Sequence, residues 1–202
     1  MKKKETRNFD FEIRIESRED KPVIIGHGAV FNSLSENLGG FREQIDPKAF
    51  DDVLTNDVRA LINHNSDKIL GRTKSGTLRL STDERGLFYE IDPPDTSYAR
   101  DLIESLKRGD ITQSSFAFSV EKDSWNEDGE GIPIRTINKV ARLYDISPVT
   151  FPAYPDADAA KRSMDEFLQS KESEKNEQAE KQKCEELRAK RLKTLSLLET
   201  KK

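Results

Sequence analysis

The 202-residue sequence contains one cysteine and two histidines, and only 34% of its residues are hydrophobic. A single cysteine excludes a disulfide framework within the chain and any multi-cysteine zinc or iron–sulfur site. The sequence has no HExxH, no GxGxxG and no GxxxxGK[ST] motif, and two isolated histidines make a poor zinc set. We therefore expect neither a metal nor a cofactor.

Long apolar runs and a basic charge balance are also missing. No apolar run approaches the ~18 residues of a membrane span, and the basic N-terminus MKKKETRNFDFEIR lacks the apolar stretch of a secretory signal. The formal net charge of -4 argues against nucleic acid as the main partner, because phosphate binding needs a basic surface. These features predict a soluble, intracellular protein with no membrane and no nucleic-acid partner.

Charged residues are abundant, at 36%, and they concentrate at the C-terminus. Residues 161–202 contain no glycine or proline, and half of these 42 residues are charged. This composition favours a helical or disordered tail over a core element. We place the boundary near Tyr154–Ala160, after SPVTFPAYPDADAA, which predicts a domain at 1–160 and a tail at 161–202. The tail is either a solvated segment without a defined role or a removable, partner-binding helix.

The first 160 residues have the alternation that is typical of β-strands. Apolar and charged residues alternate over residues 9–16, which predicts one half-buried strand. In the apolar run Val23–Phe31, Gly26 and Gly28 indicate a bulge or a close backbone approach. A short strand over Val58–Asn63 is expected to end at His64.

Two short helices are expected among these strands. Asp46-Pro47 has the N-cap and first-turn residues of one helix, and Thr96 or Ser97 caps a second helix that Gly109 ends. The remaining predicted elements are a hairpin that joins Thr77–Ser81 to Leu87–Ile91, and strands over Ile111–Glu121 and Ile132–Ile146 around a loop at Asn126–Gly131. Six to eight strands with two helices predict a mainly β, α+β fold: a closed or nearly closed β-barrel with helices outside.

The two histidines differ in their surroundings. His27, in IIGHGAV, is interpreted as a packed or surface residue of a strand. His64, in LINHNSDKILGRT, directly follows an apolar strand, where a catalytic side chain can be held rigidly and still be reached. A structural role for His64 remains open from the sequence alone.

A catalytic histidine of this kind commonly acts together with a serine nucleophile and a carboxylate. In a strict period of two, Ser114 shares the inward face of Phe116 and Phe118, whereas Ser115 lies on the face of Ala117. A serine hydroxyl becomes a useful nucleophile when a histidine removes its proton, and a carboxylate such as Asp145 can orient that histidine. Adjacent serines are also common as ordinary strand residues.

Other chemistries have less support. Cys184 lies in the charged tail, which argues against a Cys–His enzyme. Paired carboxylates for glycoside hydrolysis remain open, although the single tryptophan, Trp125, does not suggest a sugar-stacking cleft.

Six segments of the chain resemble, in order and spacing, the prohead maturation proteases of tailed phages, of the Hong Kong ninety-seven type. Together the segments cover about residues 10–160. They are Gly26–Asn32, FREQIDPKAF at Phe41–Phe50, LINHN…LGRT at Leu61–Thr73, Leu78–Thr96, LIESLKRGDITQSSFAFSV at Leu102–Val120 and LYDISPVTFPAYPDA at Leu143–Ala157.

The resemblance implies a serine endopeptidase similar in fold and active site to the herpesvirus assembly proteases. It makes His64 the general base, Ser115 the nucleophile and Asp145 the third catalytic member, at a position where the family commonly has Glu. Gln113-Ser114 replaces the usual Gly-Met or similar pair, which leaves Ser114 as a rival nucleophile. The oxyanion donors are expected to be backbone N–H groups or an arginine, with Arg72 and Arg142 as candidates.

The same resemblance implies the partners and the place of action. The expected substrates are the scaffolding region of the major capsid protein and the protease itself, inside the procapsid in the host cytoplasm, with a homodimer as a further expectation. The tail would dock in the shell and then be removed by self-cleavage. Two alternatives remain: a non-enzymatic assembly or scaffolding factor on a degenerate protease fold, and a hydrolase of small esters on a β-barrel.

Overall fold

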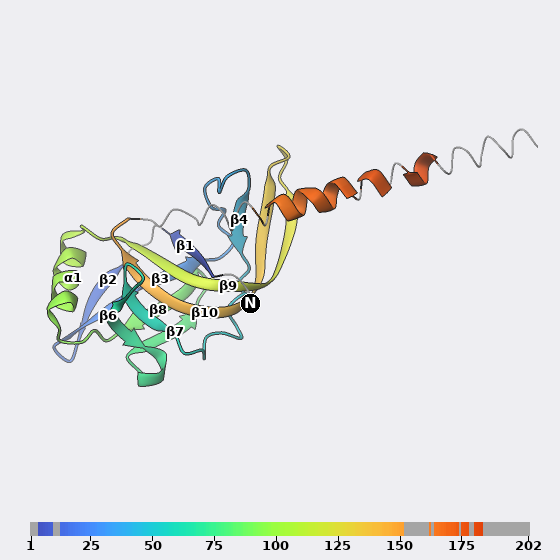
Figure 1. The fold of residues 1–202 in the computed structure, drawn as a ribbon. Helices are drawn as coiled ribbons and strands as arrows, with labels where there is room; N and C mark the ends of the chain where they lie inside the picture. The colour runs from blue at the N-terminus through green and yellow to red at the C-terminus, as the bar shows by residue number, and fades with distance from the viewer. Residues whose placement is uncertain are drawn as a thin grey trace, which may run out of the picture. The chain divides into compact units, whose positions relative to one another are not determined.

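The computed structural model describes residues 4–9, 13–151, 162, 164–173, 175–177 and 180–183, and β-strands dominate the first two ranges (Figure 1). The chain divides into two compact units, Met1–Ala160 and Lys161–Lys202. The described residues of the second unit are helical. None of the described helices is long and apolar enough to cross a membrane.

The larger of two sheets is built around a long hairpin. Strands β9 (Gln113–Glu127) and β10 (Pro133–Val149) pair antiparallel along almost their whole length and curve together in Figure 1. Four register shifts between Ile137 and Asp145 interrupt this pairing, and such bulges bend and twist a strand. Short strands flank the hairpin in the order β1-β9-β10-β5-β6, and β4 also pairs with β10: β1 (Glu5–Phe9), β4 (Arg42–Ile45), β5 (Arg59–Ile62) and β6 (Asn65–Arg72).

The second sheet is antiparallel and has the order β2-β3-β8-β7. Its strands are β2 (Arg14–Arg18), β3 (Lys21–Val30), β7 (Leu78–Thr82) and β8 (Gly86–Ile91). Both glycine predictions in β3 are confirmed. A Cβ on Gly26 would lie 2.7 Å from the Tyr89 hydroxyl, and the β3–β8 register shifts between His27 and Ala29.

The helices join strands of the two sheets. The 3-10 helix η1 (Thr73–Ser75) lies between β6 and β7, and α1 (Ser97–Arg108) lies between β8 and β9. Helix α1 ends as predicted at Gly109, whose positive φ of 78° lets its N–H bond to the Leu106 carbonyl. The apolar face of α1 is buried, as are the inward side chains of both sheets, including Tyr89, Phe116, Phe118 and Leu143. Burial of each such side chain contributes about 1.5–3 kcal/mol.

Two predicted elements are wrong. The alternation over residues 9–16 is not one strand, because β1 belongs to the larger sheet and β2 to the smaller one. No helix follows Asp46: residues 47–55 form successive turns, in which the Ala49 N–H bonds to the Asp46 carbonyl and the Val53 N–H to the Phe50 carbonyl. Within these turns Ala49, Phe50 and Val53 are buried without an α-helix.

The coarser fold prediction, mainly β with inserted helices, is confirmed. Closure into a barrel is not shown. The larger sheet is a half-barrel, and no strand pairing among the described residues joins it to the smaller sheet.

Candidate active site

The structure brings the three predicted site residues into contact. His64 Nε2 lies 2.6 Å from the Ser115 hydroxyl oxygen, and His64 Nδ1 is hydrogen-bonded to Asp145 Oδ1. The three side chains come from the β5–β6 turn, β9 and β10, which lie side by side in the larger sheet. In the sequence, His64 is 51 residues from Ser115 and 81 residues from Asp145. A base between a hydroxyl and a carboxylate is the arrangement that activates a serine.

A tight turn positions His64. Ile62 of β5 pairs with Asn65 of β6, so Asn63 and His64 form a two-residue hairpin loop. Their φ angles are 52° and 56°, and two central residues with positive φ are what a type I′ turn requires. Asparagine is one of the few side chains that tolerate this conformation, which explains why it precedes the histidine.

Asn63 also ties this turn to the end of β10. Its side-chain amide donates to Thr150 Oγ1 at 3.2 Å, and its side-chain oxygen accepts from the Thr150 N–H at 2.8 Å. Its own N–H donates to the Pro148 carbonyl at 3.0 Å. The position of His64 at the end of a strand was predicted from the sequence, but this role of Asn63 was not. The Asn-His pair directly after an apolar strand is the sequence signal from which the role of Asn63 could have been predicted.

Ser114 and Ser115 lie on opposite faces of β9, as their alternation predicted. The Ser114 hydroxyl contacts the Tyr89 hydroxyl at 2.7 Å in the core, where burial raises the pKa of Tyr89. Ser115 instead faces His64, and its hydroxyl also donates to the Arg7 carbonyl at 3.0 Å. The geometry therefore favours Ser115 over its rival Ser114 as the partner of the histidine.

Several groups hold the Asp145 carboxylate. Ser147, two residues further on the same face of β10, lies 3.2 Å from Oδ1 and accepts a hydrogen bond from the His64 N–H at 3.2 Å. Lys4 Nζ lies 3.1 Å from Oδ2. Burial raises the pKa of Asp145, but the hydrogen bond and charge of His64 and the charge of Lys4 outweigh it, so the pKa lies below its usual value. The carboxylate is thus kept ionised beside the imidazole.

The family that this chain resembles commonly has glutamate at position 145. The aspartate found here has a shorter side chain, and it still contacts His64. The β9–β10 register shifts between Leu143 and Asp145, directly before the carboxylate. Bulges of this kind re-aim a side chain and are frequent next to active sites.

The other candidate residues have partners elsewhere. His27 Nε2 lies 2.8 Å from Asp83 Oδ2, which agrees with its interpretation as a packed strand residue. Both arginines proposed as oxyanion donors are engaged outside the triad. Arg72 makes two 2.7 Å contacts with Asp57, and the guanidinium of Arg142 lies 5.0 Å from the Tyr144 ring centroid.

The remaining candidate features lie outside this site. Trp125 packs against Phe41 with ring centroids 5.1 Å apart. Cys184 and the boundary at Tyr154–Ala160 fall outside the described residues. Within the described ranges, no group of three or more His, Cys, Asp or Glu residues could hold a metal ion.

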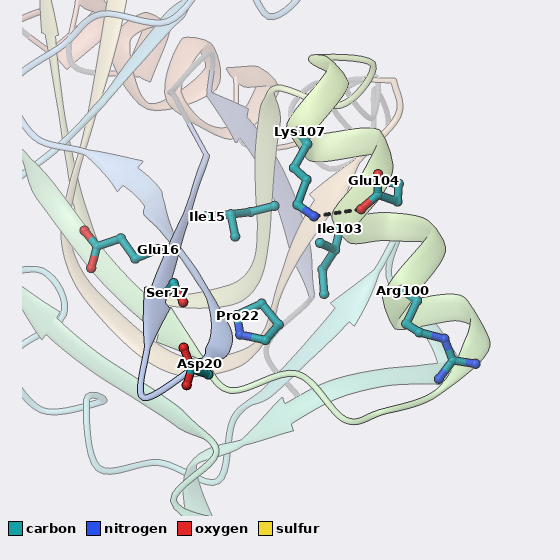
Figure 2. Close-up of a pocket in the computed structure, with 9 residues that line it drawn as sticks. All are labelled: Ile15, Glu16, Ser17, Asp20, Pro22, Arg100, Ile103, Glu104 and Lys107. Carbon is teal, nitrogen blue, oxygen red and sulfur yellow. Dashed lines mark hydrogen bonds and ion pairs between the residues drawn. The ribbon is translucent and has the colours of Figure 1, made fainter.

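A surface pocket of about 460 Å³ lies apart from the triad (Figure 2). It is bounded by the β2–β3 hairpin and α1, and on its rim Lys107 pairs with Glu104 at 2.7 Å. Its lining contains none of the three candidate catalytic residues: Ile15, Glu16, Ser17, Asp20, Pro22, Arg100, Ile103, Glu104 and Lys107.

The contacts among Ser115, His64 and Asp145 are typical of serine hydrolases. Residues 9–170 match the family model described as caudovirus prohead serine protease. Because the match spans most of the chain, the chain belongs to the caudovirus prohead serine protease family and is a serine protease of phage prohead maturation. The family predicted from the six sequence segments is confirmed.

Two further comparisons complete the picture. No curated protein matches the chain. Among solved structures, the bacteriophage T4 capsid assembly protease, gp21, is similar at 11% sequence identity and a TM-score of 0.43, over 74% of this chain and 98% of that one.

Proposed function

We propose that this protease cleaves peptide bonds with Ser115 as nucleophile, His64 as general base and Asp145 as the carboxylate that orients the histidine. The observation that supports this assignment is the continuous set of contacts from Asp145 through His64 to the Ser115 hydroxyl. A non-enzymatic assembly factor would have no need for a histidine 2.6 Å from a serine hydroxyl. The contact therefore favours catalysis over that alternative.

The chemistry follows from the positions of the protons. His64 Nε2 takes the hydroxyl proton as Ser115 Oγ bonds to the peptide carbonyl carbon, and the imidazolium then gives this proton to the leaving amine. A water molecule, deprotonated in turn by Nε2, attacks the acyl carbon. The ester bond to Ser115 Oγ then breaks, Oγ takes the proton back from Nε2, and the new carboxyl terminus is released. Asp145 accepts the Nδ1–H throughout, so Nε2 remains free to act as the base.

The proposed substrates are capsid components, in keeping with the family's place in prohead maturation. We propose the scaffolding region of the major capsid protein as the main substrate and the chain itself, within residues 155–202, as the second. The tail would dock in the shell, and because confinement inside the procapsid raises the enzyme's effective concentration, weak docking would be enough. We also propose that the fold is of the herpesvirus-protease type, with the half-barrel as its core, and that the protease forms a homodimer.

The test is the intact mass of the purified full-length chain over time, alone and mixed with the capsid precursor. We expect defined peptide fragments from the unchanged chain and from Ser114→Ala, and none from Ser115→Ala or His64→Ala. Ser114→Ala is the matched control, because it removes the neighbouring hydroxyl that faces away from His64. Cleavage by a folded Ser115→Ala variant would refute the assignment of the nucleophile. Turnover of small esters without peptide cleavage would favour the ester hydrolase.

A further inference from the structure

Strand β2 is an edge strand of the smaller sheet, and its outer side faces the pocket drawn in Figure 2. It pairs with β3 alone among the described strands. Helix α1 forms the opposite wall, so the pocket is a groove of about 460 Å³ between a strand edge and a helix. Natural sheets commonly protect such an edge with a bulge, a proline or a covering element. β2 contains neither a bulge nor a proline, and the groove separates it from α1.

The register of the β2–β3 hairpin shows which backbone groups point into this β2–α1 groove. Arg18 and Lys21 close a two-residue loop and form a hydrogen-bonded pair, whereas Ser17 lies opposite Pro22, which has no N–H to exchange. The two kinds of pair alternate along the hairpin, so Ser17 and Ile15 both direct their N–H and C=O groups away from β3. No strand pairing or loop hydrogen bond among the described residues uses these groups. Both residues line the groove.

The helical wall of the groove is one face of α1, with an apolar residue between two cations. Four residues spaced three or four apart lie along this face: Arg100, Ile103, Glu104 and Lys107. The two cations are about 10 Å apart along the helix axis. On the strand side, the Glu16 carboxylate points away from α1 in Figure 2, and Asp20 lies in the hairpin loop. The cations therefore set the charge along the middle of the helical wall.

Both cations can accept a carboxylate from a ligand. Arg100 pairs with Asp95 at 2.5 Å, and Lys107 pairs with Glu104 at 2.7 Å. All four side chains in these two pairs are more than half exposed. Ion pairs between exposed side chains contribute little, so an exchange of partner costs little.

We propose that the β2–α1 groove docks an extended segment of the capsid precursor, which adds to the smaller sheet as a strand beside β2. This inference rests on the proposed substrate of the protease. The outward groups of Ile15 and Ser17 provide main-chain hydrogen bonds, and every second side chain of the segment faces α1.

The helical wall selects the sequence of that segment. A large apolar side chain packs on Ile103, and acidic side chains two residues before and two residues after it meet Arg100 and Lys107. Two such acidic residues are about 13 Å apart in a strand, which is comparable with the spacing of the cations. The groove contains none of the triad residues, so it holds the substrate and raises the effective concentration of a linked cleavage site.

The test is the Kd between the capsid precursor and the full-length chain, with Ser115→Ala in every sample to prevent cleavage. Ser17→Pro removes an outward N–H that β3 does not use and places a ring at the strand edge, so Kd should rise about tenfold or more. The matched control is Thr82→Pro on β7, the other edge of the same sheet. The Thr82 N–H also points outward, because the next residue, Asp83, donates its N–H to the Gly86 carbonyl. This control should leave Kd unchanged.

A second pair of variants tests the charge of the helical wall. Lys107→Glu should raise Kd about threefold or more, because it repels an acidic segment. Arg108→Glu makes the same change in charge one residue further along, outside the groove lining, and should leave Kd unchanged. Circular dichroism confirms that each variant is folded, and if Ser17→Pro does not fold, this exposed pair decides.

The outcomes separate docking from catalysis. Equal Kd values for folded Ser17→Pro and Thr82→Pro, or for Lys107→Glu and Arg108→Glu, would overturn the proposal. If light scattering shows that Ser17→Pro loses a dimer while Kd stays the same, the edge of β2 joins two copies and the proposal is likewise overturned. Because these Kd values do not depend on cleavage, the expected values together with an inactive unchanged chain would refute the catalytic assignment and leave the docking site.

Discussion

The buried contact between the Ser114 and Tyr89 hydroxyls leads to a prediction that separates stability from catalysis. The two oxygens are 2.7 Å apart, and both residues are 0% exposed. Ser114→Ala or Tyr89→Phe leaves the other hydroxyl without this partner, which costs about 1–3 kcal/mol in the free energy of unfolding. For a domain of this size each kcal/mol lowers Tm by about 2–4 °C, so each single variant should melt about 2–12 °C earlier.

The double variant and the activity assay complete the test. Ser114→Ala/Tyr89→Phe leaves no orphaned hydroxyl, so its loss should be smaller than the sum of the single losses by about 1–2 kcal/mol. Thermal denaturation followed by circular dichroism gives these values. Well below Tm, Ser114→Ala should cleave the capsid precursor near the unchanged rate, whereas Ser115→Ala should lose about a thousandfold or more. Additive losses, or a folded Ser114→Ala as inactive as Ser115→Ala, would refute the reasoning.

Three further predictions concern the surroundings of the triad. Asn63→Ala removes two hydrogen bonds to Thr150 and a side chain suited to positive φ, so urea denaturation should show a loss of about 1–3 kcal/mol. Ser147→Ala removes a hydrogen bond to Asp145, and steady-state kinetics should show kcat about 10- to 100-fold lower with KM little changed, partly rescued by Ser147→Thr. Asp145 and Glu5 have pKa values below their usual ones, so their stabilisation is present above about pH 4 and is lost as pH falls through the lower folded values. Glu5→Gln should therefore flatten the acid limb of a urea-denaturation series from pH 7 to pH 3.

Local sequence patterns predicted those parts of the fold that depend on near neighbours. Period-two alternation assigned Ser114 and Ser115 to opposite faces of β9, and the structure has them there. Gly109 ends α1 because only a residue that accepts positive φ can take that position. The narrow space beside Gly26 was likewise predicted, although its occupant, Tyr89, was not.

Features that depend on distant pairing could not be predicted in this way. Apolar and charged residues alternate without a break from Phe9 to Glu16, from the end of β1 into β2, so nothing in residues 9–16 shows that the chain passes from one sheet to the other. The roles of Ser147 and Tyr89 likewise depend on partners 25 or more residues away, at His64 and Ser114. Register across such separations is set by the packed sheets and not by local composition.

Of the three segments that carry the candidate catalytic residues, strand β10 determines the geometry of the site most. The C-terminal residues of β10 pair with β9 on one side, where Ser147 lies opposite Ser115. On the other side they pair with β5, where Asp145 lies opposite Arg59. Asp145 and Ser147 are two residues apart and so share the face that meets His64. A shift of β10 by one residue would turn both side chains to the opposite face and separate the carboxylate from the imidazole. Substitutions that disturb the bulges before Asp145 should therefore abolish activity without touching a catalytic side chain.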